Sequence, residues 1–233
     1  MARPRRARPT RGQSRRDRLF VTVLAVLALV AGLGIVWFGL GGDLGLGLEQ
    51  VSREPGSFVD MDGRKVIPDE DAVADDPDGD SRPDIGKRFI IDSVGLDVPL
   101  GTARMTGNRI APPGFTSAYV MTNLGTDLDH PEDGTVFVAT HSLRGGGRAP
   151  GNYLIDIARQ TAAVHPGDTV LVAGVEYRIA ETRVIAKTQI ADVPEVWADV
   201  PGRLVVFTCL QNQQNAPSAN NLVVIATLVD QPR

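Results

Sequence analysis

The stretch "RLVVFTCLQNQQ", residues 203–214, contains Cys209, the single cysteine of the 233-residue chain. An apolar, β-branched run leads up to the thiol and a polar segment follows it, a pattern that predicts a strand ending near Cys209. Because a lone cysteine cannot form a disulfide within its own chain, structure alone does not explain it. Two interpretations stay open at this point: an inert buried thiol, or a nucleophile at the end of a strand.

The N-terminal region predicts a membrane anchor. Residues 1–18 carry eight arginines and one acidic residue, and residues 19–40 contain no charge. About 20 apolar residues cross the hydrocarbon core of a bilayer as a helix, whereas a cleaved signal peptide has a shorter apolar core. Arginine stays on the cytoplasmic side, so we expect a basic cytoplasmic tail, a retained single-pass transmembrane helix in the cell membrane and an extracellular remainder.

The charge balance argues against nucleic acid as a partner. Residues 41–233 hold 16 Lys and Arg against 27 Asp and Glu, a net charge of −11. An acidic domain of this kind repels a phosphate backbone. The basic residues of the segment 1–18 stand next to the expected membrane span, where they set its topology and contact anionic lipid.

The part beyond the anchor divides into a tether and one domain. Residues 41–86 are rich in Gly, Pro and acidic residues, which predicts an acidic flexible linker. Residues 87–233 have the size of one domain and contain eight short β-branched or alternating runs, which predict a closed barrel or a sandwich. A short helix capped by Asn152 is expected at "GNYLIDIA" (151–158), and a further helical turn at "DVPEVWADV" (192–200).

The histidines supply the candidate base for thiol chemistry. His130 and His165 each precede a proline in turn-like surroundings and are predicted to lie in loops. His141 instead ends the apolar run "TVFVATH", just before the glycine-rich loop "SLRGGGRAPG" (142–151), which we expect to be mobile. One cysteine and three scattered histidines form no metal-ligand cluster, so no metal or other cofactor is expected.

The order of these motifs resembles that of the sortases over nearly the whole chain. The matching parts are His141 after an apolar strand, the "FTC" of residues 207–209, and the C-terminal run "NLVVIAT" (221–227). The resemblance implies a mainly β fold, an eight-stranded sortase-type β-barrel with one or two short helices, preceded by an N-terminal transmembrane helix and a disordered linker. The arginine-rich tail, with no helix ahead of the domain, is similar to the class E-like actinobacterial branch.

The resemblance also implies an extracytoplasmic cysteine transpeptidase. Cys209 would attack an LPxTG-like sorting signal of a surface protein, and His141, as imidazolium, would protonate the departing amine. Thr208 would help to bind the substrate and the oxyanion. The thioester would then pass to an amine of a peptidoglycan precursor or a pilin. The partners implied are thus proteins that carry sorting signals, together with cell-wall or pilin amines on a Gram-positive surface.

One family marker, an arginine that opens the last strand, is missing. Counting back five residues from Ala226 leads to Asn221, and no arginine lies between Cys209 and Arg233. Asn221 is therefore the candidate replacement, because its amide donates hydrogen bonds. Arg144 and Arg148, in the loop after the histidine, are the alternatives.

Two other interpretations stay open. The missing arginine fits a catalytically degenerate sortase-like barrel that acts as a membrane-anchored binding module. The lone thiol also fits an unrelated anchored β-domain in which Cys209 is merely buried.

Overall fold

The computed structural model describes residues 58–68, 72–73, 80–107 and 109–229. The expected cytoplasmic tail and the expected transmembrane helix lie outside these residues. Within the described ranges, no helix is both long and apolar enough to cross a membrane. The prediction of a membrane anchor therefore stays a prediction.

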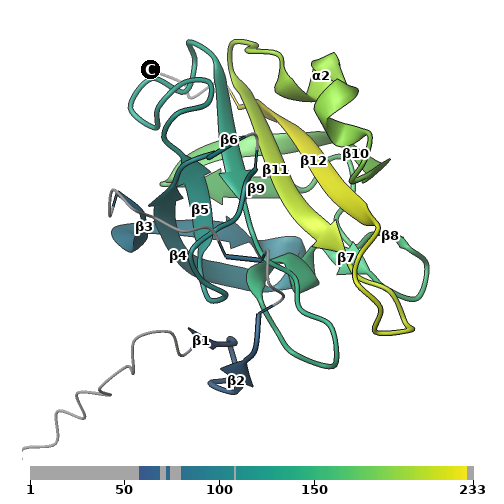
Figure 1. Ribbon diagram of the computed structural model, residues 1–233. Helices are drawn as coiled ribbons and strands as arrows, with labels where there is room; N and C mark the ends of the chain where they lie inside the picture. Colours follow the sequence, from purple (N-terminus) through teal and green to yellow (C-terminus); the bar gives the residue numbers. More distant parts are fainter. Residues whose placement is uncertain (1–57, 69–71, 74–79, 108, 230–233) are drawn as a thin grey trace, which may run out of the picture. The chain divides into compact units, whose positions relative to one another are not determined.

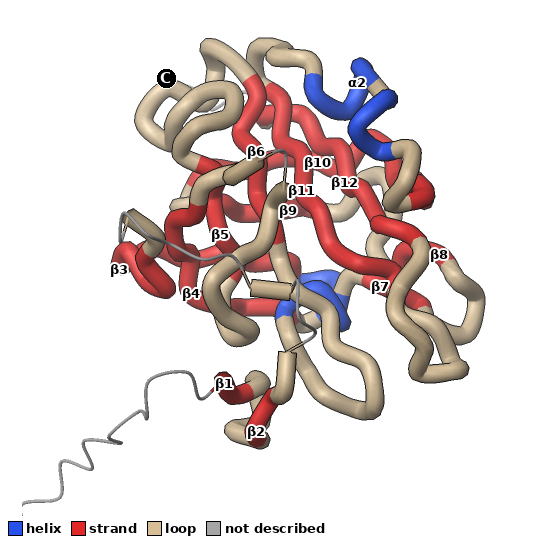
Figure 2. Tube along the Cα trace, viewed as in Figure 1, coloured by secondary structure: helices blue, strands red, loops and turns tan. Residues whose placement is uncertain are grey.

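Eight strands close into a barrel in the order β10-β12-β11-β6-β5-β4-β3-β9 (Figure 1). The predicted mainly β, eight-stranded barrel is confirmed. Two small hairpins, β1-β2 and β7-β8, accompany it, and few of the described residues are helical (Figure 2). The barrel strands are β3 (Arg82–Ile91), β4 (Leu96–Ala103), β5 (Ala118–Met121), β6 (Thr135–Ala139), β9 (Thr169–Val172), β10 (Val175–Ala186), β11 (Arg203–Leu210) and β12 (Asn220–Leu228).

The remaining elements are short. The hairpins consist of β1 (Phe58–Val59) with β2 (Lys65–Val66) and β7 (Ile155–Asp156) with β8 (Thr161–Ala162). Three single-turn 3-10 helices are η1 (Asp92–Val94), η2 (Pro150–Tyr153) and η3 (Ile190–Asp192), and α2 (Pro194–Trp197) is the helical turn expected at "DVPEVWADV".

Strands β6 and β11 are neighbours in the barrel. They pair in parallel, with Arg203 opposite Thr135 and Phe207 opposite Ala139. All five residues of β6 are buried, because one side of the strand faces the barrel interior and the other side is covered. Strands covered on both faces read as continuous apolar runs, which is why "TVFVA" shows no alternation.

Alternate residues of these strands enter two different apolar clusters. The inner cluster fills the barrel and includes Val138, Val206 and Leu210. The outer cluster includes Phe137 and Phe207, and Trp197 of α2 packs on it with its ring 5.1 Å from that of Phe207. The segment that carries η3 and α2 thus closes the outside of β6 and β11.

A β-bulge in β10 changes which residues face outward. Ile179 pairs with Ala226 but Glu181 pairs with Ile225, so Ala180 is an extra residue. Before the bulge, Ile179 belongs to the inner cluster. After it, Ile185 packs against the outer cluster. A bulge of this kind reverses the in-and-out alternation of the strand.

The structure corrects two local expectations. Residues 58–68, placed in the flexible linker by composition, form the β1-β2 hairpin, and β3 begins at Arg82 rather than after residue 86. The hairpin turn is organised by buried Asp60, whose Oδ1 accepts hydrogen bonds from the amides of Asp62 and Arg64 at 2.9 and 2.8 Å. The helix expected at "GNYLIDIA" is a single 3-10 turn followed by β7.

Candidate active site

His141 lies beside Cys209 because the β6–β11 pairing continues past the end of β6. The Thr140 amide donates to the Phe207 carbonyl at 2.9 Å, and the Ser142 hydroxyl donates to the Cys209 carbonyl at 2.6 Å. Extending the register by two residues puts His141 opposite Cys209. The strand-end placement predicted for both residues therefore holds in the fold.

Asn221 is the direct cross-strand partner of Cys209. Side chains of directly opposed residues in an antiparallel pair share one face, with Cβ atoms about 4.5–5.5 Å apart. That face is the outer one, since Phe207 and Val223, two residues away on each strand, belong to the outer cluster. Three neighbouring strand ends thus present His141, Cys209 and Asn221 on the same side of the sheet.

His141 is held in an apolar recess. Its side chain is 9% exposed and its ring stacks on Phe115 with centroids 4.5 Å apart. Nε2 lies 2.9 Å from the carbonyl oxygen of Pro112. Because a carbonyl only accepts, Nε2 carries the proton and Nδ1 is the basic nitrogen.

The imidazole is neutral at pH 7. Burial lowers the pKa of His141 to about 4, the hydrogen bond to Pro112 acts in the opposite direction, and the positive charge of Lys187 lowers it further. A neutral His141 acts as an acid only after it has taken a proton, for example from the Cys209 thiol. Within the described residues, no hydrogen bond yet joins the two side chains.

Two polar residues missed by the sequence analysis tie the site together. Ser142 bonds the Cys209 carbonyl, and the Gln211 side chain donates to the Ser142 carbonyl at 2.9 Å. Both side chains are buried. A polar residue directly after each apolar run was the available signal, because a buried polar side chain there needs partners.

Thr208 does not face the thiol. Its side chain is buried on the inner face, since strand neighbours alternate. It packs so closely on Gly151 that a Cβ at that glycine would overlap its hydroxyl. The Thr208 hydroxyl thus lies on the inner face, away from the Cys209 side chain, and a substrate contact by another group of Thr208 stays a prediction.

The alternative arginines lie in the loop 142–151. Arg148 pairs with Asp62 at 3.2 Å and its guanidinium lies over the Tyr153 ring, 5.1 Å from the centroid. The first contact holds it to the β1-β2 hairpin, and the second to η2. Arg144 is half-buried, in a turn that the Gly147 amide closes on its carbonyl at 3.3 Å. A substrate contact by Arg144 stays a prediction.

The loop that contains these arginines is tied at its base. Asn152 Oδ1 accepts from the amides of Leu143 and Ala149 at 2.8 and 2.9 Å, and its Nδ2 donates to the Leu143 carbonyl. Asn152 therefore closes a loop instead of capping a helix. The tip is more open, with Gly145 and Gly146 exposed and at positive φ. The mobility expected for the loop stays a prediction.

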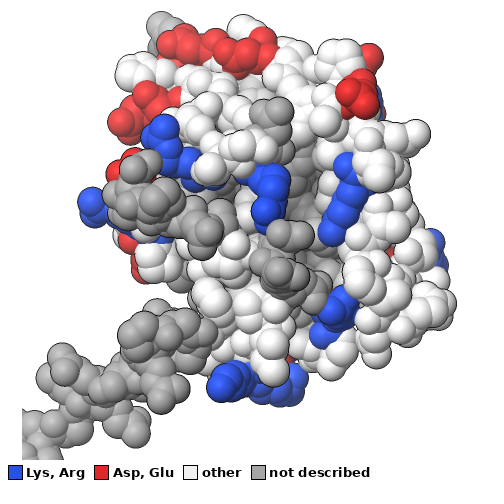
Figure 3. Space-filling model, in the orientation of Figure 1, with Lys and Arg blue, Asp and Glu red and all other residues white. Residues whose placement is uncertain are grey.

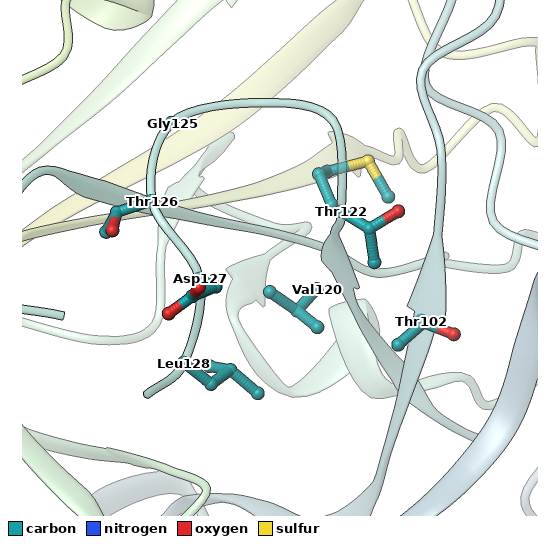
Figure 4. Close-up of a pocket in the computed structure, with 8 residues that line it drawn as sticks. Thr102, Val120, Thr122, Gly125, Thr126, Asp127 and Leu128 are labelled. Carbon is teal, nitrogen blue, oxygen red and sulfur yellow. The ribbon is translucent and has the colours of Figure 1, made fainter. Parts of the chain in front are cut away.

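A cavity lies at the other end of the barrel from the site. It measures about 360 Å³ and lies beneath the loop that begins at Thr122 (Figure 4). Gly125, in its lining, packs against the Thr135 end of β6. Cys209 is six residues beyond the partner of Thr135 on β11, about 20 Å away. The lining residues are Thr102, Val120, Met121, Thr122, Gly125, Thr126, Asp127 and Leu128.

Comparison with known proteins gives a fold likeness only. No protein-family model matches the chain, and no curated protein matches it. Among solved structures, Listeria monocytogenes sortase A is 17% identical, with 62% of this chain and 86% of that chain covered and a TM-score of 0.44. A Clostridium perfringens sortase D5 transpeptidase is 14% identical (61% and 78% covered, TM-score 0.42), and sortase C-1 of Actinomyces oris is 15% identical (64% and 76%, TM-score 0.42). At these values the likeness does not establish a family.

Proposed function

We propose that the chain is a cysteine transpeptidase of the sortase type, anchored in the cell membrane with its barrel outside. The observation that carries the proposal is the cross-strand pair of Cys209 and Asn221, with His141 at the adjoining strand end. A nucleophile, a base and an amide donor on one face are the groups that acyl transfer requires. The class E-like branch, the LPxTG-like signal and the wall or pilin amine belong to the same proposal.

The reaction follows from the neutral state of the histidine. His141 Nδ1 takes the thiol proton as the Cys209 sulfur attacks the substrate carbonyl. The carbonyl π pair moves to oxygen, where the Asn221 amide donates a hydrogen bond. When the intermediate collapses, the C–N bond breaks and His141 returns the proton to the leaving amine. The incoming amine then attacks the thioester while His141 again serves as base.

A second candidate is a binding module on the same barrel. The observation that favours it is the depth of His141, which is stacked on Phe115 and not bonded to the thiol. A barrel in this state would bind a sorting signal without turning it over.

Intact-mass analysis distinguishes the two candidates. The full chain in detergent would be incubated with an LPxTG-like peptide library, with and without an amine. A transpeptidase shows a mass increase on the wild-type chain that hydroxylamine removes, and a ligated product with the amine. Peptide binding without any covalent adduct would support the module and refute the enzyme.

A further inference from the structure

Lys187 extends the β10 ladder to the level of the site. Ala186 pairs with Asn220, and the Lys187 amide donates to the Ala219 carbonyl at 2.9 Å, so the antiparallel pairing continues by one residue. Two residues before it, Ile185 pairs with Asn221, which itself pairs with Cys209. Lys187 therefore lies at the end of β10, and a single strand, β12, separates β10 from the strand that carries Cys209.

The bulge at Ala180 determines which face the lysine occupies. After the bulge, odd-numbered residues of β10 face outward, as Ile185 does in the outer cluster. Lys187 comes two residues later and so begins on the same face as Cys209. Without the extra residue, the alternation would place this side chain on the inner face.

The Lys187 side chain can bring its ammonium about half of the way from its own Cα to that of Cys209. Strands lie about 4.8 Å apart and rise about 3.3 Å per residue, so the Lys187 Cα is roughly 12 Å from that of Cys209. A lysine side chain spans about 6 Å, which covers half of this distance. The positive charge of Lys187 also contributes to the lowered pKa of His141.

The charge of Lys187 is not committed elsewhere in the described chain. No ion pair of the described residues involves it, and its side chain is exposed. The neighbouring cation on the same face differs, because Arg183 is paired with Glu181 at 2.7 Å. Figure 3 shows basic side chains across the middle of the face in view, with acidic side chains gathered toward its upper edge.

We propose that Lys187 is the cationic residue of this site, and that its ammonium holds the oxyanion formed when Cys209 attacks the substrate carbonyl. The inference rests on the proposed function and names a residue that the family pattern does not. Asn221 donates a neutral hydrogen bond, and the Lys187 ammonium donates a charge-assisted one, which is about twice as strong. Together they perform the task for which the resemblance leads one to expect an arginine.

Charge-selective alkylation tests the placement without any substrate. Cys209 is the single thiol, so iodoacetate (anionic) and iodoacetamide (neutral) report on one site of the full chain in detergent. A cation within about 7 Å favours the anionic reagent by roughly threefold even at the dielectric constant of water. Lys187→Ala should lower the iodoacetate-to-iodoacetamide rate ratio at least threefold. Lys187→Arg should retain the ratio, and so should Lys87→Ala, an exposed lysine on β3.

Single-turnover acylation tests the catalytic part. Loss of one oxyanion donor costs about 10²–10³ in rate, and Asn221 remains in the variant, so Lys187→Ala should slow acylation at saturating peptide at least tenfold. The KM should stay within threefold, and Lys187→Arg should recover most of the rate. An active wild type with an unchanged alkylation ratio in Lys187→Ala would overturn the inference and leave the proposed function standing. A wild type that forms no thioester would overturn the proposed function and the oxyanion role with it, while a lowered ratio would still locate the ammonium beside Cys209.

Discussion

The two faces of β11 differ in what surrounds them. On the inner face, Leu204, Val206 and Leu210 are buried in the filled barrel from one end of the strand to the other. On the outer face the apolar cover from α2 reaches Phe207 and stops, and Cys209 comes next beside Asn221. The same strand therefore provides stability on one side and an accessible thiol at the end of the other. The proposed nucleophile thus lies where the apolar cover ends.

The largest expected effect comes from comparing a substitution on the outer face of β11 with one on its inner face. Cys209→Ala should abolish thioester formation and leave the unfolding midpoint close to that of the wild type, because the thiol is half-buried at the strand end. Leu210→Ala, its inner-face neighbour, should keep the thiol reactive but lose about 2–5 kcal/mol of stability. Intact mass and urea unfolding of the full chain in detergent measure both. Full transpeptidation by Cys209→Ala would end the proposal.

The burial of His141 predicts an acid-sensitive stability. Its pKa is about 4 in the fold and about 6.5 in the unfolded chain, so the unfolded state binds the proton more tightly. The stabilisation is complete above pH 6.5 and is lost as the pH falls toward 4, by up to about 3 kcal/mol. Urea unfolding at pH 7 and pH 4.5 measures the loss of stability. The control, His141→Gln, has no imidazole, so its free energy of unfolding should fall less between these two pH values. An equal loss of stability in both proteins would show that the imidazole is not buried.

Asn221 and Asn220 form a matched pair across the two faces. Asn221 is opposite Cys209 on the outer face, whereas Asn220 is opposite Leu210 and faces the other way. Asn221→Ala should slow acylation at least tenfold, because a neutral oxyanion donor is lost, and Asn220→Ala should not. Stopped-flow acylation measures the rates. Similar near-wild-type rates for both variants would direct attention to Lys187 and Arg144.

The smallest effect concerns the loop after His141. Its base amides, Leu143 and Ala149, are bonded to the Asn152 side chain, so they should exchange slowly while the exposed Gly146 exchanges fast. Asn152→Ala removes hydrogen bonds worth about 1 kcal/mol each and should speed exchange at the base about fivefold. Hydrogen exchange with mass spectrometry measures it. Fast exchange at the base in the wild type would restore the expectation that the whole loop is mobile.

The sequence predicted what depends on local patterns. The apolar runs located the barrel strands, and proline after His130 and His165 placed both histidines in exposed loops, as the structure shows. The strand ends of His141 and Cys209 followed from where each run stops. These features are local because β-branched runs and turn residues act over a few positions.

Features that depend on distant partners were missed. The β1-β2 hairpin has the composition of a linker but is stabilised by contacts such as the Met61 amide bonded to the Arg148 carbonyl at 2.8 Å. The inward face of Thr208 and the outward face of Lys187 depend on strand register and on one extra residue in β10. Neither register nor a bulge has a reliable signature in a single sequence.

The parallel pairing of β6 with β11 has a consequence for the timing of folding. The bond between Ser142 and the Cys209 carbonyl joins residues separated by 67 positions, whereas Cys209 and Asn221 belong to neighbouring antiparallel strands that follow each other in the sequence. Pairings of such long range form late, since the loop entropy is lost before the contacts compensate for it. A partly folded chain therefore pairs Cys209 with Asn221 before His141 is brought beside them. Under the proposed function, the site is complete only once β6 has joined β11.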